Sequence, residues 1–226
     1  RQMTVSDLAD RASERLTSDA SLDDETASML GVTLASFAFS MGREAAGTAM
    51  SEQALARARK GGSATAEALA LSLIGGMALS RGDCQAAAAR DGEVSAILAS
   101  HGREFSAAES AALLVSSGQV KENCDRNFPA FLALTTEAVD LSRTIADTEM
   151  AASMPAPVFK ALVMNGHATA LVRNQRPADA RTAVEEGLRQ AAGHPDGRSA
   201  RIALLRTRAS IDYAEKKVVE AATALE

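Results

Sequence analysis

Alanine is the feature that most restricts how this chain can fold. It accounts for 49 of the 226 residues, whereas aromatic residues make up only 3% and tryptophan is absent. Alanine has the highest helix propensity, and its small side chain lets two helices approach closely. A sheet core would require runs of β-branched and aromatic residues, and no such run occurs in the sequence. The composition therefore predicts an all-α protein in which helices pack on helices.

Local signals divide the chain into eleven expected helices. Capping-box patterns, which satisfy backbone N–H groups at a helix start, begin at Thr4, Ser21 and Ser106. Glycines that favour helix ends occur at positions 61–62, 102, 118 and 193. The expected helices are 4–18, 22–41, 44–60, 63–81, 84–101, 106–117, 127–147, 156–174, 177–192, 197–215 and 218–226. Most connections are short, which predicts antiparallel hairpins, and only 118–126 and 148–155 are longer.

The repeat becomes visible when the turn glycines Gly42 and Gly82, which are 40 residues apart, are aligned. Small residues then recur seven and four positions before the turn and five positions after it. They are Ala35, Ala38 and Gly47 in one copy and Gly75, Ala78 and Ala87 in the next. Small residues at these positions let the two helices of a tetratricopeptide-repeat (TPR) hairpin press together. We therefore predict an α-α superhelix, a TPR-like solenoid of antiparallel helical hairpins.

Looser copies of the pattern extend the predicted array along the chain. Segments 137–143 and 178–191 repeat the second-helix pattern, and a further unit starts near residue 201. We expect one continuous domain over residues 21–226, with about four and a half hairpins cut off at the carboxyl end, preceded by a capping helix at 1–20. The period is longer than the usual ~34 residues, and Leu, Ile and Ala replace the large Trp and Tyr of the usual consensus.

A family resemblance rests on the first sixty residues. Its parts are Asp7-Leu8, Asp10-Arg11-Ala12, Arg15-Leu16, Leu30-Gly31, Ala54-Leu55 and Ala58-Arg59. They resemble the TPR region that follows the single transmembrane helix of bacterial membrane Ser/Thr protein kinases, where a "DLxDRAxxRL" helix leads into "L-G" and "AL-x-x-AR" helices. The resemblance implies a periplasmic sensor region with a kinase domain upstream. Cytoplasmic TPR regulators carry comparable strings, so they remain the alternative.

The chain itself lacks the residues of kinase chemistry and of other common functions. It has no Gly-rich phosphate loop, HRD-type loop or DFG-type metal site. The net charge is −5 and no basic stripe is interleaved with aromatics, which disfavours nucleic acid as a partner. No apolar stretch approaches the ~20 residues that span a bilayer, so membrane attachment is expected only through an upstream anchor. We expect neither a cofactor nor catalysis by this segment.

The two cysteines, Cys84 and Cys124, each lie close to an expected turn. Turns of neighbouring units stack on one edge of a solenoid, so the two could form a disulfide, which would argue for an oxidising compartment. The alternative is two unrelated buried thiols. No Cys or His lies at metal-ligand spacing near either residue, so metal binding is disfavoured.

The three histidines do not indicate an active site. His101 and His194 are expected at helix ends, and His167 is expected at the edge of the core. No Ser or Cys nucleophile can be paired with any of them from the sequence. No catalytic residue is therefore predicted.

Binding is expected on the concave face, which the first helix of each hairpin lines. The candidate groove residues are Met29, Ser36, Phe39, Leu69, Ser72, Asn165, Thr169, Arg173, Arg206 and Tyr213. This register gives an apolar amino-terminal end and a more polar, basic carboxy-terminal end, which would suit a peptide with an acidic end. The alternative is that several of these side chains only pack or face solvent.

The sequence thus favours a protein- or peptide-binding region over an enzyme. Our leading hypothesis is a periplasmic TPR-like sensor region of a receptor-type bacterial Ser/Thr kinase. One alternative is a cytoplasmic TPR regulatory domain of a transcriptional regulator. Another is an oligomerisation scaffold in which exposed helix faces form a homodimer.

Overall fold

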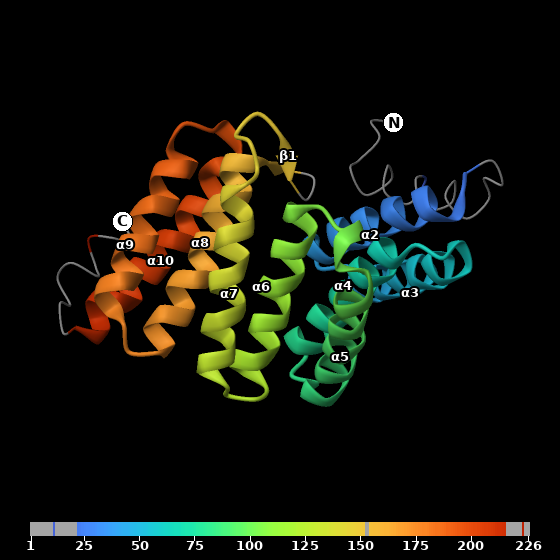
Figure 1. The fold of residues 1–226 in the computed structure, drawn as a ribbon, viewed down its shortest axis with the longest axis horizontal. Helices are drawn as coiled ribbons and strands as arrows, with labels where there is room; N and C mark the ends of the chain where they lie inside the picture. Colours follow the sequence, from blue (N-terminus) through green and yellow to red (C-terminus); the bar gives the residue numbers. More distant parts are fainter. Residues whose placement is uncertain (1–10, 12–21, 152–153, 216–222, 224–226) are drawn as a thin grey trace. The chain divides into compact units, whose positions relative to one another are not determined.

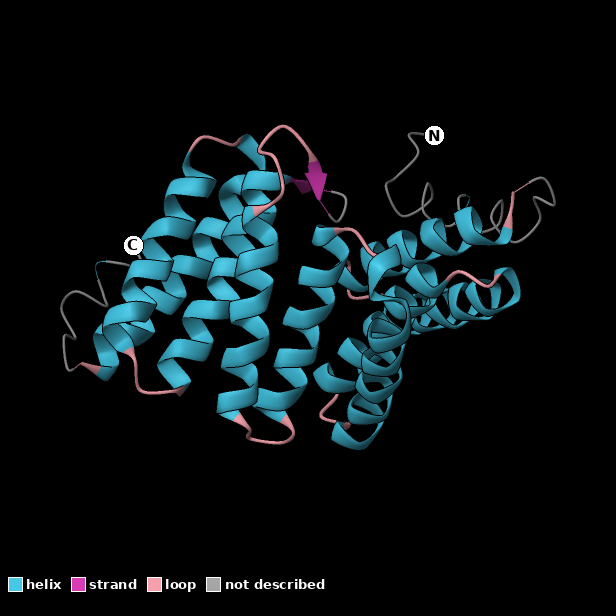
Figure 2. Cartoon of the chain, in the orientation of Figure 1, coloured by secondary structure: helices cyan, strands magenta, loops and turns pink. Residues whose placement is uncertain are grey.

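The computed structural model describes residues 22–151 and 154–215, together with residues 11 and 223. Nine α-helices fill most of these described residues (Figures 1 and 2). They are α2 (Asp24–Ser40), α3 (Glu44–Gly61), α4 (Ala64–Ser80), α5 (Cys84–His101), α6 (Ala107–Asn123), α7 (Phe128–Arg143), α8 (Ala156–Arg173), α9 (Pro177–Ala192) and α10 (Arg198–Ala214). The all-α prediction is confirmed. The chain divides into two compact units, residues 1–104 and 105–226, which are described separately below.

Unit 1 contains two antiparallel hairpins, α2 with α3 and α4 with α5. The turns of the two hairpins contain the same backbone hydrogen bond. Gly42 N–H donates to Phe39 O and Gly82 N–H donates to Leu79 O, each over 2.9 Å. Both glycines have a positive φ, 72° and 75°, which strains other L-residues. The sequence alignment on these two glycines is therefore confirmed as a structural repeat.

The small residues of the repeat lie where the helices of each hairpin meet. Ala35 and Ala87 are fully buried. A Cβ placed on Gly47 of α3 would lie 3.2 Å from the Ala35 carbonyl oxygen of α2, and one on Gly75 of α4 would lie 3.3 Å from Arg90 Cβ of α5. Larger side chains would push the helices apart, because protein interiors are close-packed. These contacts explain why small residues recur at the aligned positions.

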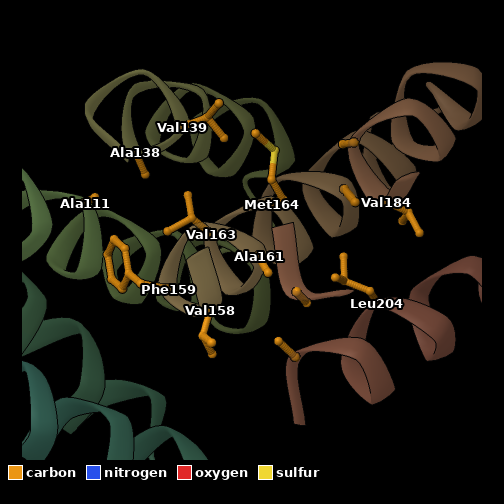
Figure 3. Close-up of a cluster of buried hydrophobic side chains, with 14 of the residues drawn as sticks. Ala111, Ala138, Val139, Val158, Phe159, Ala161, Val163, Met164, Val184 and Leu204 are labelled. Carbon is orange, nitrogen blue, oxygen red and sulfur yellow. The ribbon is translucent and has the colours of Figure 1, made fainter. Parts of the chain in front are cut away.

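Unit 2 consists of the hairpins α6 with α7 and α8 with α9, followed by α10. The first helices α6, α8 and α10 contact one another in succession, and α8 also contacts α7. Figure 3 shows the core around α8, a cluster that includes Phe159 and Met164 of α8, Val139 of α7, Val184 of α9 and Leu204 of α10. All five side chains are buried. Helix α8 thus lies at the centre of the hydrophobic core of this unit.

Two capping patterns can be compared with the structure. The box at Ser106 is confirmed, because Ser106 Oγ accepts from the Glu109 N–H at 3.2 Å and Glu109 Oε2 accepts from the Ser106 N–H at 2.8 Å. The helix expected after Ser21 is instead capped by Asp23, whose carboxylate accepts from the Thr26 N–H at 2.8 Å. Asp23 lies directly before the first turn of α2, and Asp caps a helix as well as Ser does.

The prediction that Gly118 ends a helix is wrong, since α6 continues to Asn123. Gly118 is instead a packing residue: a Cβ there would lie 2.7 Å from Phe131 Cδ2 of α7. The aromatic ring therefore occupies the space that a side chain at position 118 would need. The irregular connection expected over 118–126 shrinks to residues 124–127, and α7 ends at Arg143 rather than 147.

Residues in the predicted 148–155 connection form a small antiparallel β-hairpin, β1 (Met150–Ala151) with β2 (Met154–Pro155), drawn in magenta in Figure 2. Ala151 is fully buried, and both strands contact α8. Two-residue strands are too short to leave an alternating pattern in the sequence, which explains why no strand was expected.

Several predictions concern residues outside the described ranges. They include the capping helix at 1–20 and the helix at 218–226. The continuity of one domain across residues 104 and 105 stays a prediction. Among the described helices, none combines the length and the apolar character needed to cross a bilayer.

Candidate functional site

The first helices of unit 2 carry several of the predicted groove residues. We call the surface formed by α6, α8 and α10 the first-helix surface. Asn165 of α8 accepts a hydrogen bond through Oδ1 from Thr207 Oγ1 of α10 at 2.8 Å. Thr169 Oγ1 donates to the Asn165 backbone oxygen at 3.0 Å. Asn165 and Thr169 thus both lie on α8, and Asn165 links it to α10; that they line a binding groove stays a prediction.

Arg173, at the end of α8, contributes less positive charge to this surface than expected. Its Nε donates to Glu122 Oε1 of α6 at 2.6 Å, and the Glu122 carboxylate is almost fully buried. A buried carboxylate needs a charged partner, so this pair holds α6 and α8 together while it offsets the arginine charge. No local pattern predicts this pairing, because 51 positions separate the two residues.

The two predicted residues of α10 are accessible. Tyr213, the only tyrosine in the chain, is 70% exposed, and Arg206 is also exposed. Ile202 lies on the same side of the helix at i−4 from Arg206 and is 43% exposed. An exposed tyrosine and arginine beside an apolar side chain form the kind of surface that anchors a protein partner.

In unit 1 the predicted residues separate into two groups. Met29 of α2 and Leu69 and Ser72 of α4 are half-buried, and Ser36 of α2 is exposed. Phe39 lies instead against α3, because a Cβ on Gly47 would be 3.6 Å from the Phe39 ring. We therefore assign Phe39 to packing within its hairpin. The register did not include Leu30 and Phe37, which are the exposed large apolar residues of α2, at 44% and 37%.

A cavity of about 300 Å³ opens on the opposite side of α8, between α7 and α9. We call it the α7–α9 pocket. Its floor is apolar and consists of Val139, Met164, Leu171 and Ala183. Its rim is polar and charged, with Thr136, Asp140 and Arg143 from α7 and Asp179, Thr182 and Glu186 from α9, and with Arg176 at the cap of α9. No sequence pattern predicts this site, because three helices must pack before it exists.

His167 of α8 lines this pocket and is half-buried. Its Nδ1 lies 3.3 Å from Thr135 Oγ1 of α7, whose hydroxyl also lies 3.0 Å from the Phe131 carbonyl oxygen. Burial lowers the pKa of His167 below its usual 6.5, and the positive charges of Arg143 and Arg176 lower it further. The neutral imidazole therefore predominates at pH 7. The expectation of a core-edge position is confirmed, but the pocket beside it was not foreseen.

Ion pairs satisfy most of the charges on the pocket rim. Arg143 Nη1 lies 3.1 Å from Asp140 Oδ1, and Arg176 Nε lies 2.7 Å from Asp179 Oδ2. Glu186 forms no hydrogen bond or ion pair with any residue that the structure describes. Its carboxylate is therefore open to a ligand.

The remaining histidines and the cysteines lie at helix ends. His101 Nδ1 is 2.9 Å from Glu104 Oε1, and His194 Nδ1 accepts from the Asp196 N–H at 3.2 Å. Cys84 is the first residue of α5 in unit 1, and Cys124 caps α6 in unit 2. Neither cysteine is a free thiol. The described part of the chain holds no group of three or more His, Cys, Asp or Glu residues suited to a metal ion.

Comparison with known proteins identifies the fold. No protein-family model matches the sequence, and neither does any curated protein. Among solved structures, BtubC (BKLC) from P. vanneervenii is similar with a TM-score of 0.70 at 18% identity, over 96% of this chain and 85% of that one. The TPR-like repeats of a Podosopora anserina protein assigned as a kinesin light chain are similar with a TM-score of 0.60 at 15% identity, over 95% and 92% of the two chains. The chain therefore has the fold of TPR-like helical repeats.

Proposed function

We propose that this chain binds a protein or peptide through its first-helix surface and performs no catalysis itself. The exposed residues of α10 carry the proposal, since Tyr213 and Arg206 are both exposed and Ile202 is exposed beside them. Tyrosine and arginine dominate the binding energy of many protein interfaces. Repeats of helical hairpins also present extended surfaces suited to this role.

A peptide-display screen against the purified chain tests the proposal. We expect it to return peptides whose affinity falls by more than tenfold in Tyr213→Ala and clearly in Arg206→Ala. Arg189→Ala is the matched control, because Arg189 is exposed on the second helix α9. Equal losses in Arg206→Ala and Arg189→Ala would show that binding only follows overall charge. A screen that returns no saturable binder would contradict the proposal.

We further propose that the chain is the periplasmic sensor region of a receptor-type bacterial Ser/Thr kinase. The motif parts between Asp7 and Arg59 support this proposal. A disulfide between Cys84 and Cys124 would fit an oxidising compartment, and the lack of a free thiol is consistent with it. Any kinase activity would then reside in a domain upstream of Arg1.

The coding sequence upstream of Arg1 tests this second proposal. A kinase domain followed by one transmembrane helix is the expected arrangement. A DNA-binding domain joined to the repeats would contradict it and would favour a cytoplasmic regulator. The molar mass in solution separately tests the oligomerisation alternative, because a monomer at high concentration excludes a stable homodimer.

A further inference from the structure

The α7–α9 pocket contains hydrogen-bond acceptors that the protein itself leaves unused. The hydroxyl of Thr135 has one proton, and its oxygen lies 3.0 Å from the Phe131 carbonyl and 3.1 Å from the Leu132 carbonyl. The proton therefore goes to these carbonyls, and the oxygen accepts from His167 Nδ1. In the neutral ring that faces the pocket, Nε2 is then left as an acceptor.

The second unused acceptor is Glu186. This carboxylate lines the pocket and has no partner among the described residues. The other rim charges offset one another, because Arg143 pairs with Asp140 and Arg176 pairs with Asp179. The charged residues of the lining therefore leave one uncompensated charge, the negative charge of Glu186. A ligand that complements this charge brings a positive charge and N–H groups.

The shape of the pocket restricts the ligand further. About 300 Å³ is at the small end of ligand sites, and the floor of Val139, Met164, Leu171 and Ala183 is apolar. We propose that this pocket binds a primary ammonium group carried on a short apolar stem, with the stem on the floor and the ammonium donating to Glu186. The site lies on the second-helix side of unit 2 and is independent of the first-helix surface. Two sources supply this chemistry, a lysine side chain of a partner peptide and a free alkylamine.

Titration of the full chain by NMR tests the proposal with defined probes. The probes are n-butylammonium, N-acetyl-lysine N-methylamide and, as the uncharged isostere, N-acetyl-norleucine N-methylamide. We expect a saturable shift of the His167 ring signals with a cationic probe and none with the norleucine compound. Stronger binding of the lysine compound identifies a peptide lysine as the source, and stronger binding of n-butylammonium identifies a free amine.

Two neighbouring glutamates provide a matched pair of variants. Glu186→Gln should weaken binding by about tenfold or more, because it removes the charge inside the pocket. Glu185→Gln removes the same charge one position away, where the side chain is exposed and does not line the pocket. It should leave the affinity within about twofold. Three outcomes would overturn the proposal. The first is an equal loss of affinity in the two variants, and the second is binding of the norleucine compound as strong as that of the lysine compound. The third is the absence of a saturable shift with either cation.

Discussion

Arg181 of α9 and Asp212 of α10 form an ion pair in which Nη2 lies 2.7 Å from Oδ1. The Asp212 side chain is only 2% exposed, whereas Arg181 is 29% exposed. The same guanidinium lies 2.7 Å from Glu215 Oε2. Asp212 Oδ1 makes no hydrogen bond of good geometry within the described residues, so Arg181 alone offsets the burial of this carboxylate.

Replacing Arg181 with Met should lower the free energy of unfolding by about 3 kcal/mol, because it leaves Asp212 buried and unpaired. The double variant Arg181→Met/Asp212→Leu should recover most of that loss, since two apolar side chains replace the pair. Urea denaturation measures both. Arg143→Met is the control, because its pair with Asp140 is exposed and contributes less than about 1 kcal/mol. An equally large decrease in the free energy of unfolding in the control would show that burial of the ion pair does not set its contribution to stability.

Gly118 should not tolerate a methyl group, although alanine is the better helix former. Gly118→Ala places a Cβ 2.7 Å from the Phe131 ring, and such overpacking costs about 1–3 kcal/mol. Gly92→Ala in the middle of α5 is the matched control. No atom lies within 4 Å of its new Cβ, so the higher helix propensity should leave stability unchanged or raise it by up to about 1 kcal/mol. The thermal unfolding temperature should therefore fall in Gly118→Ala and not in Gly92→Ala, and an equal fall in both variants would argue against the packing role.

His167 should titrate below its ordinary pKa of 6.5, which an NMR titration of its ring protons can measure. The groups around it are Asp140 and Arg143 on α7 and Arg176, Asp179 and Glu186 at α9. Burial disfavours the imidazolium, and the two arginines outweigh the nearby carboxylates. A value at or above 6.5 would contradict the described burial.

The same shift makes stability depend on pH. Below pH 6.5 the unfolded chain binds a proton at His167 that the folded chain does not, so the free energy of unfolding rises with pH in this window. It should fall as the pH drops from 7 towards 5. His167→Gln should show a smaller fall, and chemical denaturation at several pH values compares the two proteins. Identical slopes would contradict the prediction.

A bridge between Cys84 and Cys124 should contribute about 2–4 kcal/mol, because it would close a loop of about 40 residues in the unfolded chain. The oxidised chain should have a mass two hydrogens lower than the reduced chain, and thiol titration should find no free thiol. Cys84→Ser/Cys124→Ser should unfold at lower temperature and lose its sensitivity to reductant. Unchanged stability of the double variant in the absence of reductant would contradict a stabilising bridge.

The candidate binding residues were predictable only in part. Helix spacing grouped Asn165 and Thr169 on α8, but the contact of Asn165 with Thr207 of α10 appears only in the tertiary structure, and their place in a binding groove stays a prediction. The same register misplaced Phe39, whose ring turns toward Gly47 of the partner helix. The direction of a large side chain depends on the space that the neighbouring helix leaves, and that space is not a local property of the sequence.

By itself the sequence determined the helical class, the positions of most helices and the repeat, although not every helix end. Alanine content, caps such as Ser106 and turn glycines such as Gly42 act within a few residues of themselves, so they can be recognised along the chain. Only the tertiary structure decided which charges are buried and where a cavity remains. Arg181 meets Asp212, and His167 meets the rim of the α7–α9 pocket, through packing between helices far apart in the sequence. The free energy of such contacts depends on burial, which no local pattern specifies.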